Sequence, residues 1–305
     1  MSEAVTVQVG GRTVRLSNLD KVMYPSNGFT KGQCLEYYTR IADTVLPHVR
    51  SRPLVMARYP DGFGGPMFYQ KRCPEGKPEW VHTAHMASEA AKGDVNFCVV
   101  EDLASLAWLV NLAALELHTL LCRAEDVYTP TLIAFDLDPG PGADLVDCSR
   151  VALQLRKLCQ EAGLQAFPKS SGKKGMHLNV PLNTPATYDQ TKAFAHGLAT
   201  LLEQREPDRV TSNMRKDHRE GRVFVDWSQN DEHKSTLCVY SLRVTETPRV
   251  STPLTWEEVE AAVKRKDGGR LVFGPEEVLK RVEKMGDIHA PVATLQQKVP
   301  EIPRE

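Results

Sequence analysis

Two aspartates at the end of an apolar run constrain this chain more than any other feature. The run Thr131–Leu137 is followed by Pro139 and Gly140, so it predicts a buried strand that ends in a turn. Residues i and i+2 of a strand point to the same side, so Asp136 and Asp138 emerge together. Two converging carboxylates repel each other unless a proton or a cation lies between them. Because Mg²⁺ and Mn²⁺ prefer oxygen ligands, the pair predicts a divalent-cation site.

A third aspartate, Asp226, ends a second predicted strand over residues 222–226. Three carboxylates at the ends of two strands can hold two divalent ions, the minimum for two-metal phosphoryl or nucleotidyl transfer. Taken singly, each aspartate also fits a solvated turn or a capping residue. The other motifs of the chain decide between these interpretations.

The segment Ser170–His177 has the composition of an anion-binding loop and lies between two predicted strands. Its two glycines permit a turn that aims successive N–H groups at an anion, and its lysines, serines and histidine add charge and donors. These are the groups that a triphosphate pocket requires. The segment is not a Walker A loop, and a basic surface turn is the alternative interpretation.

Composition sets broad limits on the protein. A chain of 305 residues can bury a sizeable core, as one large domain or as two lobes of one site. Its 41% hydrophobic and 25% charged content is ordinary for a soluble enzyme. Because the net charge is only −1, any nucleic-acid partner has to be bound by local basic patches.

Cysteines, histidines and apolar segments favour a cytosolic protein. The seven cysteines form no Cys-x-x-Cys pair, which predicts reduced thiols and argues against a disulfide framework or a structural zinc. His82 and His85 have metal-ligand spacing for a helix, but the sequence nearby supplies no third ligand. The first residues do not resemble a signal peptide. The apolar stretch Leu103–Leu121 contains polar residues and predicts a core helix rather than a membrane span.

Periodicity and turn signals predict a mixture of short strands and helices. Val5–Val9 and Arg12–Leu16 alternate around two glycines and predict a hairpin. A capping box of Thr30 and Gln33 opens a helix to about Leu46. Further strands are expected near 54–59, 68–71, 95–100, 165–168, 177–181, 222–226 and 236–240, and helices near 103–121, 146–162, 189–205 and after Thr255 and Pro275. This mixture favours an α+β fold with antiparallel or mixed sheets.

Two short segments combine basic and aromatic residues. Lys21 and Lys31 flank Tyr24–Phe29, and Phe68-Tyr69 precedes a glutamine, a lysine and an arginine. Such pairings suit base stacking beside phosphate neutralisation, although aromatics at this spacing also occur in cores. The segment Arg205–Arg222 has six basic and four acidic residues, which favours a solvated, salt-bridged face.

Six segments, in a common order, resemble the polymerase domain of bacterial ligase D. They are Leu16–Pro25, Ala113–His118, Phe135–Gly140, Ser171–His177, Val223–Asn230 and Tyr240–Arg243. The resemblance covers about residues 5–290. It implies a primase-polymerase fold of the archaeo-eukaryotic primase superfamily, with an RRM-like catalytic sheet and a second flanking sheet. It also implies template-directed addition of nucleotides, with NTPs preferred over dNTPs, to DNA 3′ ends at gaps and double-strand breaks.

The resemblance assigns residues to this activity. Asp136, Asp138 and Asp226 match catalytic metal ligands for two Mn²⁺ or Mg²⁺ ions, and His118 lies at the active centre. The nucleotide-binding positions are Ser171, Gly172, Lys174, His177, Gln229 and Arg243. The DNA-binding positions are Asn18, Lys21, Lys31, Phe68, Tyr69, Lys71 and Arg219. Within these sets Lys21 and Lys31 match a pocket for the downstream 5′-phosphate, and Phe68 and Tyr69 match an aromatic pair that stacks on template bases. The second aromatic is Tyr here where the family has Phe.

The implied partners are DNA with a 3′ end and a downstream 5′-phosphate, NTP or dNTP, and also Ku and a ligase domain or protein. We expect no membrane partner and a cytoplasmic, nucleoid-associated location. The 305 residues are expected to form a single primase-polymerase domain. They contain no ligase lysine motif or phosphoesterase motif, so we expect a standalone polymerase or a domain of a larger ligase.

Two other functions fit part of the pattern. A Mn²⁺-dependent glycosyltransferase also uses Asp-x-Asp, but it does not need Asp226 or the 170–177 loop. A non-catalytic DNA-end-binding module could keep the fold, but the presence of all three aspartates argues against it.

Overall fold

The computed structural model describes residues 4–87 and 93–300, which form two compact units. Unit 1 comprises Met1–Val127, Leu237–Ser251 and Phe273–Asp287, and unit 2 comprises Tyr128–Thr236, Thr252–Val272 and Ile288–Glu305. Each unit combines a sheet with helices, so the α+β prediction is confirmed. No helix in the described part of the chain is both long and apolar enough to span a membrane.

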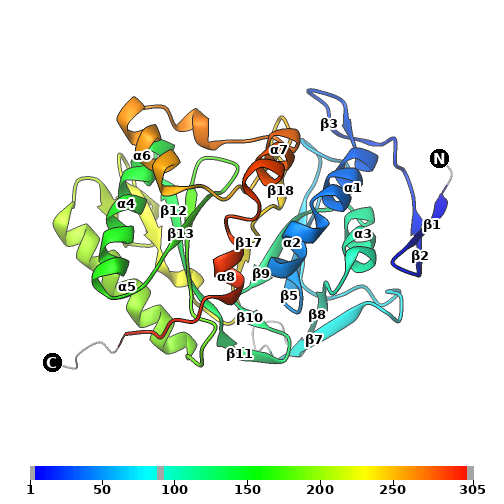
Figure 1. The fold of residues 1–305 in the computed structure, drawn as a ribbon, viewed down its shortest axis with the longest axis horizontal. Helices are drawn as coiled ribbons and strands as arrows, with labels where there is room; N and C mark the ends of the chain where they lie inside the picture. The colour runs from blue at the N-terminus through cyan, green and yellow to red at the C-terminus, as the bar shows by residue number, and fades with distance from the viewer. Residues whose placement is uncertain (1–3, 88–92, 301–305) are drawn as a thin grey trace. The chain divides into compact units, whose positions relative to one another are not determined.

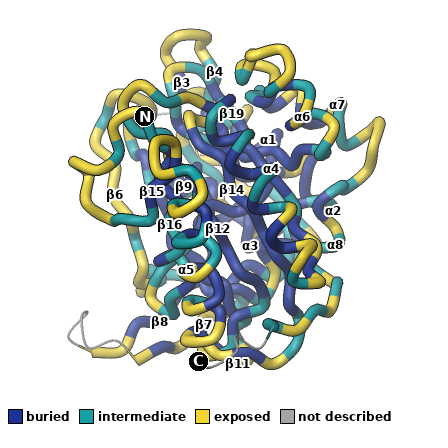
Figure 2. Tube along the Cα trace, turned by 90° about the vertical axis from the view of Figure 1, so that its left-hand side faces the viewer, coloured by how far each residue is buried: buried dark blue, intermediate teal, exposed yellow. Residues whose placement is uncertain are grey.

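Unit 1 is built on an antiparallel sheet in which β5 is central. The strand order is β17-β9-β5-β8-β7, and β6 pairs with β5. The bounds are β5 (Pro53–Arg58), β6 (Phe68–Gln70), β7 (His82–Met86), β8 (Val95–Val99), β9 (Ala114–Leu120) and β17 (Ser235–Leu237). β5 and β9 are almost entirely buried, whereas β6 is exposed, so β6 presents its side chains to solvent (Figure 2).

In unit 1 one helix contacts the other three, and one of those three contacts β9 of this sheet (Figure 1). The helices are α1 (Lys31–Arg40), α2 (Ala42–Val49), α3 (Leu103–Asn111) and α7 (Pro275–Met285). The predicted capping box is present, since Gln33 N donates to Thr30 Oγ1 and Thr30 N donates to Gln33 Oε1. The predicted helix to Leu46 is instead two helices, because Ile41 (φ −92°, ψ 1°) leaves the helical conformation.

Unit 1 also contains short hairpins. The predicted pair β1 (Val5–Val9) and β2 (Arg12–Leu16) is confirmed residue by residue. The others are β3 (Val22–Tyr24) with β4 (Phe29–Thr30) and β18 (Leu242–Arg243) with β19 (Arg249–Val250). A further hairpin pairs β10 (Cys122–Arg123) with β11 (Asp126–Pro130), a strand that begins in unit 1 and continues past its boundary at Val127. The β3–β4 hairpin brings Lys21 and Lys31 to neighbouring backbone positions, since Lys31 N donates to Lys21 O at 2.8 Å.

The predicted helix Leu103–Leu121 is wrong in its second half. Helix α3 ends at Asn111, Ala113 has a left-handed φ of 60°, and residues 114–120 form β9. Every residue of β9 is buried, so the strand shows none of the apolar–polar alternation that would have revealed it. A continuous apolar run does not distinguish a buried strand from a buried helix.

Two further predictions are corrected in unit 1. Cys73 and Cys98 form a disulfide, so not all seven cysteines are reduced thiols; the other five are free and buried. The two cysteines lie close together because Cys73 N donates to Asn96 O on β8. They are 25 residues apart in the sequence, so no local pattern predicts this contact. His82 and His85 lie on strand β7 rather than a helix, so they point to opposite faces and cannot share an ion.

Unit 2 is built on a five-stranded sheet of order β13-β14-β12-β16-β15. The strands are β12 (Leu132–Pro139), β13 (Phe167–Ser170), β14 (Met176–Pro181), β15 (Val210–Thr211) and β16 (Val223–Asp226). Neighbours are antiparallel except β15 and β16, which are parallel. Helices α4 (Leu145–Glu161) and α5 (Tyr188–Arg205) contact each other and β12, so they cover one face of the sheet (Figure 1). The shorter α6 (Trp256–Arg265) packs on α4, and α8 (Ala290–Thr294) contacts β14.

Candidate functional site

A row of polar residues crosses four strands of the sheet in unit 2. Lys169 is paired with His177, His177 with Asp136, and Asp136 with Asp226. Directly opposed residues project to the same face of an antiparallel sheet. Asp138 lies two residues beyond Asp136 on β12 and therefore shares that face. The backbone register thus brings the three predicted metal ligands to one face of one sheet.

The opposite face of β12 anchors the strand. Phe135 and Leu137 alternate with the aspartates and are fully buried. Helix α4 packs there, and its Cys148 Sγ lies 3.5 Å from Leu137 O. Burial, and then the negative charges of Asp138 and Asp136, raise the pKa of the Cys148 thiol. This thiol therefore stays protonated and contributes no charge of its own to the site.

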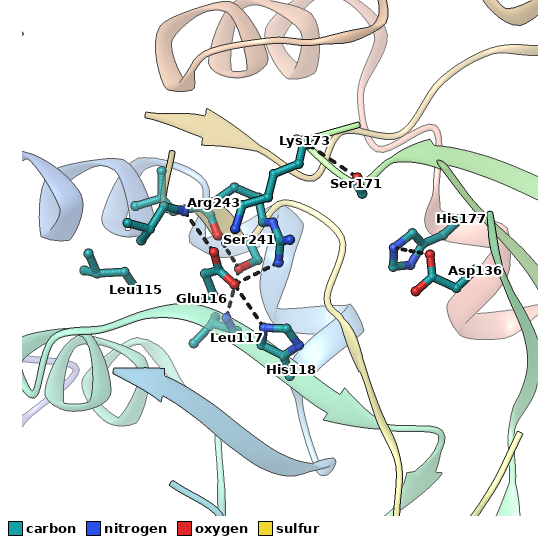
Figure 3. A network of polar contacts seen from close by, with 12 residues as sticks. Leu115, Glu116, Leu117, His118, Asp136, Ser171, Lys173, His177, Ser241 and Arg243 are labelled. Atoms are coloured by element: carbon teal, nitrogen blue, oxygen red, sulfur yellow. Dashed lines mark hydrogen bonds and ion pairs between the residues drawn. The ribbon is translucent and has the colours of Figure 1, made fainter. Parts of the chain in front are cut away.

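The row is joined by hydrogen bonds as well as by register. Lys169 Nζ lies 3.2 Å from His177 Nδ1. His177 Nε2 lies 3.3 Å from Asp136 Oδ1 (Figure 3). An imidazole that accepts at Nδ1 carries its proton on Nε2, where it can donate to the carboxylate. Lys169, which is 2% exposed, has no local sequence signal, because only the strand register shows that it faces His177.

The third carboxylate is held by the turn that follows β16. Asp226 Oδ1 accepts from Ser228 N at 3.0 Å and from Ser228 Oγ at 2.5 Å. Asp226 Oδ2 accepts from Gln229 Nε2 at 2.8 Å. Gln229 was predicted to bind nucleotide, and the structure places it against this carboxylate.

Asn230 fixes the same turn to β12. Its Oδ1 accepts from Ala134 N at 2.9 Å and its Nδ2 donates to Ala134 O at 2.8 Å. The residue is fully buried. β16 pairs with β12 only from Asp136 to Pro139, so this amide satisfies a peptide group beyond the last backbone pair.

The donor set fits a hard divalent cation. Within residues 4–87 and 93–300 no three His, Cys, Asp or Glu side chains already lie close enough together to hold a metal ion. Asp226 and Asp136 are instead engaged with Gln229, Ser228 and His177. Carboxylate oxygens on one face are nevertheless the donors that Mg²⁺ and Mn²⁺ prefer.

The predicted anion-binding loop connects β13 and β14. Ser171 Oγ accepts from Lys173 N at 3.3 Å and from Gly175 N at 3.2 Å, and Gly172 has a φ of 74° (Figure 3). Two backbone N–H groups therefore converge on one point, as an anion-binding turn requires. A Cβ at Gly175 would lie 2.5 Å from Leu137 O, so glycine lets the loop approach the aspartate strand. Lys173 and Lys174 are exposed.

Unit 1 contains a second polar cluster, centred on Glu116 of β9. Arg243 Nη1 lies 2.8 Å and His118 Nε2 lies 3.2 Å from Glu116 Oε2, and both side chains point toward it (Figure 3). Two residues predicted to act at the active centre, His118 and Arg243, are thus brought together. Glu116 itself was missed, although it lies inside the motif Ala113–His118.

Lys21 and Lys31 lie close together but are engaged within unit 1. Lys21 Nζ is 2.7 Å from Asp61 Oδ1, and Lys31 Nζ donates to Ser17 O at 2.6 Å. Lys31 is 4% exposed. Burial, and then the charge of Lys21, lower the pKa of Lys31 to about 8. Asn18 is exposed and has a left-handed φ of 53° in the adjoining segment.

The predicted stacking pair is exposed rather than buried. Phe68 and Tyr69 on β6 are 44% and 56% exposed, which excludes their assignment to a core. The Arg58 guanidinium lies 5.3 Å from the Phe68 ring centre, and the Tyr69 ring meets the His118 ring edge-on at 5.5 Å. Lys71 follows β6 and is exposed.

Arg219 of unit 2, a predicted DNA contact, packs within its own unit. Its guanidinium lies 3.7 Å from the Phe224 ring centre, and Nη2 donates to Met214 O at 2.9 Å. The structure therefore gives Arg219 a packing contact with β16, and its contact with DNA stays a prediction.

Comparisons with known proteins give the same family over almost the whole chain. The profile of the LigD primase-polymerase domain matches residues 30–289. The multifunctional non-homologous end joining protein LigD of Mycolicibacterium smegmatis is 37% identical over 281 residues, which is 92% of this chain. The bifunctional non-homologous end joining protein LigD of Bacillus subtilis is 30% identical over 274 residues, which is 90% of this chain.

A solved structure gives the same result. The polymerase domain of Mycobacterium tuberculosis ligase D in complex with DNA matches with a TM-score of 0.85 at 35% identity, covering 93% of this chain and 99% of that domain. The curated relatives are longer: the chain spans 36% of the M. smegmatis protein and 43% of the B. subtilis protein. The primase-polymerase fold predicted from the six motifs is confirmed.

Proposed function

The chain belongs to the LigD primase-polymerase domain family. From this premise we propose that it is a metal-dependent, DNA-directed nucleotidyltransferase that extends DNA 3′ ends at gaps and double-strand breaks in end joining. The observation that carries the proposal is the register of unit 2, which puts three carboxylates and His177 on one face of the sheet. Membership of this family excludes the glycosyltransferase alternative.

The proposed metal site consists of Asp136, Asp138 and Asp226. Two Mn²⁺ or Mg²⁺ ions bound there would activate the primer 3′-hydroxyl and neutralise charge on the triphosphate. The chain's own part is to fix these carboxylates: His177 orients Asp136, while Ser228 and Gln229 orient Asp226. The family relation supports this assignment, and the choice of metal and the number of ions form part of the proposal.

The proposed nucleotide contacts in unit 2 are Ser171, Gly172, Lys174 and His177. Converging N–H groups of the loop suit phosphate oxygens, and Lys174 is exposed. In unit 1 we assign Arg243 to the same ligand class, because its guanidinium can make planar contacts with phosphate.

Replacing Lys174 with Ala should mainly raise the NTP concentration needed for extension. A charge-assisted contact contributes roughly 1.5–3 kcal/mol, so the apparent KM should rise about 10- to 150-fold. Primer-extension kinetics over a range of NTP concentrations measure this. Lys157→Ala, which removes an exposed lysine on α4 of the same unit, is the matched control and should leave KM unchanged. An unchanged KM in Lys174→Ala would remove this lysine from the pocket.

The proposed 5′-phosphate pocket lies at the start of α1. Lys21 and Lys31 are joined through their backbones, and Lys31 is the first residue of a capped helix. A helix N-terminus favours anions, and a terminal phosphate carries more charge than an internal phosphodiester. The pocket would therefore favour ends that bear a downstream 5′-phosphate.

The double variant Lys21→Ala/Lys31→Ala should bind 5′-phosphorylated gapped DNA roughly 10-fold or more weakly, on the scale of one or two charge-assisted contacts. Affinity for the same gap with a 5′-hydroxyl should change much less. Both affinities have to be measured at one salt concentration, since counterion release would obscure the comparison. Equal binding of the two gaps by the wild type would show that this pocket does not exist.

The structure adds two refinements to that test. Asp61 neutralises Lys21 in the free protein, so Asp61→Asn should tighten binding of the phosphorylated gap by roughly 2- to 5-fold, the scale of an exposed ion pair. Lys31, with a pKa of about 8, loses its proton as the pH rises. The preference for the 5′-phosphate should therefore weaken between about pH 7 and pH 9. A preference that is constant over this range would exclude Lys31 from phosphate binding.

The remaining partners are proposed from the family. DNA bases are assigned to Phe68 and Tyr69, whose exposure suits stacking, and the backbone to Asn18, Lys71 and Arg219. A ligase domain or protein and Ku are proposed as partners in end joining, because the relatives are named end-joining proteins and are longer than this chain. We place this activity in the cytoplasm, at the nucleoid.

The decisive experiment is primer extension on a gapped, 5′-phosphorylated DNA, with NTPs compared with dNTPs and Mn²⁺ compared with Mg²⁺. We expect extension with a preference for NTPs. Binding of the gapped DNA without extension in either metal would instead support a non-catalytic end-binding module.

A further inference from the structure

The sheet of unit 1 aligns an exposed aromatic with a buried carboxylate. Tyr69 of β6 is paired with Ala57 of β5, and Ala57 is paired with Glu116 of β9. Opposed residues share a face, so these three side chains form one row. Ala57 is small and fully buried, which leaves Tyr69 and Glu116 with only a methyl group between them. After burial, the charge of Glu116 is the next cause that raises the pKa of Tyr69.

Glu116 is the centre of a fully buried hydrogen-bond cluster. It is 1% exposed; its Oε1 accepts from Val244 N at 2.9 Å, and its Oε2 accepts from Arg243 Nη1 at 2.8 Å. The Tyr59 hydroxyl also bonds to it, and burial and this carboxylate raise the pKa of Tyr59. A buried carboxylate is costly unless it is paired and hydrogen-bonded. The cluster meets this need, so Glu116 is held rigidly.

The guanidinium of Arg243 is only partly used by this cluster. Its Nη1 is bound to Glu116, while its Nε is buried and lacks a hydrogen-bond partner among the described residues. A buried donor without an acceptor is uncommon and calls for an explanation such as an unseen ligand. The contact through Nη1 fixes the guanidinium, and 16% of the Arg243 side chain stays exposed to a further acceptor.

Glu116 also determines which ring nitrogen of His118 carries a proton. A carboxylate only accepts hydrogen bonds, so the 3.2 Å contact places a proton on His118 Nε2. The same ring packs edge-on against Tyr69, at 5.5 Å between ring centres. Glu116 therefore orients a cation and an imidazole (Figure 3), and the imidazole contacts an exposed aromatic ring.

We propose that Glu116 is a positioning residue for nucleotide binding: it fixes the Arg243 guanidinium, which is partly exposed, for contact with the triphosphate, and it fixes the His118 ring against Tyr69. This inference rests on the proposed function of Arg243. It adds a residue that touches no substrate but determines how well the substrate is bound.

The test compares Glu116→Gln with the wild type in primer extension. Gln keeps the size of the side chain and one acceptor, but it presents an amide N–H₂ group where Arg243 and His118 need an acceptor. The apparent KM for NTP should rise about 10-fold, on the scale of one charge-assisted contact, while affinity for DNA stays within about 2-fold. Glu116→Asp restores the charge on a shorter side chain and should recover part of this loss. If Glu116→Gln does not fold, Glu116→Asp carries the same comparison.

The second arm asks whether the effect passes through Arg243. In an Arg243→Ala background, Glu116→Gln should cause no further rise in KM, because the group that it positions is absent. An equal rise in both backgrounds would overturn the proposal. If Arg243→Ala leaves KM unchanged, Arg243 does not bind nucleotide, and both this proposal and that assignment fail. Absence of extension by the wild type would instead reject the proposed polymerase function itself.

A matched control separates positioning from stability. Asp287 is another largely buried carboxylate of unit 1, and it accepts from the Tyr240 hydroxyl at 2.7 Å and contacts His48 Nε2 at 2.8 Å. Asp287→Asn should lower the thermal unfolding midpoint without changing the KM for NTP. If it raises KM as much as Glu116→Gln does, general loosening of the unit explains the effect and Glu116 has no positioning role.

Discussion

Asp138→Ala should abolish nucleotide addition and leave DNA binding nearly intact. Asp138 is exposed at the end of β12, so its removal opens no cavity in the core. Losing one carboxylate of a two-metal site removes several kcal/mol of transition-state stabilisation, whereas DNA is assigned to other groups. Primer extension at saturating Mn²⁺ and a gel-shift affinity on the same DNA measure the two effects.

Asp189→Ala is the matched control for that variant. Asp189 is an exposed aspartate in the first turn of α5, in the same unit but outside the polar row. Its removal should cost a few tenths of a kcal/mol, up to about 1 kcal/mol, of helix stability and leave extension unchanged. The two-metal assignment would be wrong if Asp138→Ala kept more than about a tenth of the wild-type rate.

Gly140→Ala should destabilise unit 2 and also reduce extension. Gly140 N donates to Arg222 O at 2.8 Å, and a Cβ at position 140 would lie 1.7 Å from Arg219 O. Two backbone segments meet here, so no side-chain rotation relieves the clash. Overpacking of this kind costs about 1–3 kcal/mol and occasionally more. The shift would reach Asp138 and Asp226, because the affected segments directly follow β12 and precede β16.

Gly197→Ala provides the opposite expectation in the same unit. Gly197 lies in the middle of α5, and nothing lies within 4 Å of a Cβ built there. Alanine in an exposed helix interior is favoured over glycine by about 0.8–1 kcal/mol. In denaturant unfolding, the midpoint should fall for Gly140→Ala and rise for Gly197→Ala. Equal stability of Gly140→Ala and wild type would show that the 140 and 219 segments do not pack as described.

Local sequence patterns predicted the elements that hold the site. The apolar run ending in Asp136 and Asp138 is β12, the short apolar run ending in Asp226 is β16, and the glycine–lysine segment is the β13–β14 loop. Each depends on periodicity or turn chemistry within about ten residues, which a sequence displays directly. The family resemblance then supplied the roles, which local patterns do not contain.

Features that depend on strand register were missed. Glu116 lies in a recognised motif, but its importance follows from its pairing with Ala57 and from Arg243, 127 residues away. Lys169 and the Cys73–Cys98 bond depend likewise on which strands become neighbours. β9 was read as helix because burial on both faces removes the period of two. Long-range pairing decides these features, and a single sequence does not state it.

The sheet that contains the three aspartates depends on the side-chain amide of Asn230. It substitutes for a missing strand, with its two polar atoms bonded to the N–H and C=O of Ala134, two residues before Asp136. The turn that contains Asp226 is therefore hydrogen-bonded to β12, the strand that contains Asp136 and Asp138. A side chain of similar shape without this donor and acceptor would remove both hydrogen bonds to Ala134. The turn would then no longer be fixed to β12, and Asp226 would move relative to Asp136 and Asp138. Substitutions at this buried position would therefore reduce catalytic activity, although Asn230 itself does not have to contact a substrate.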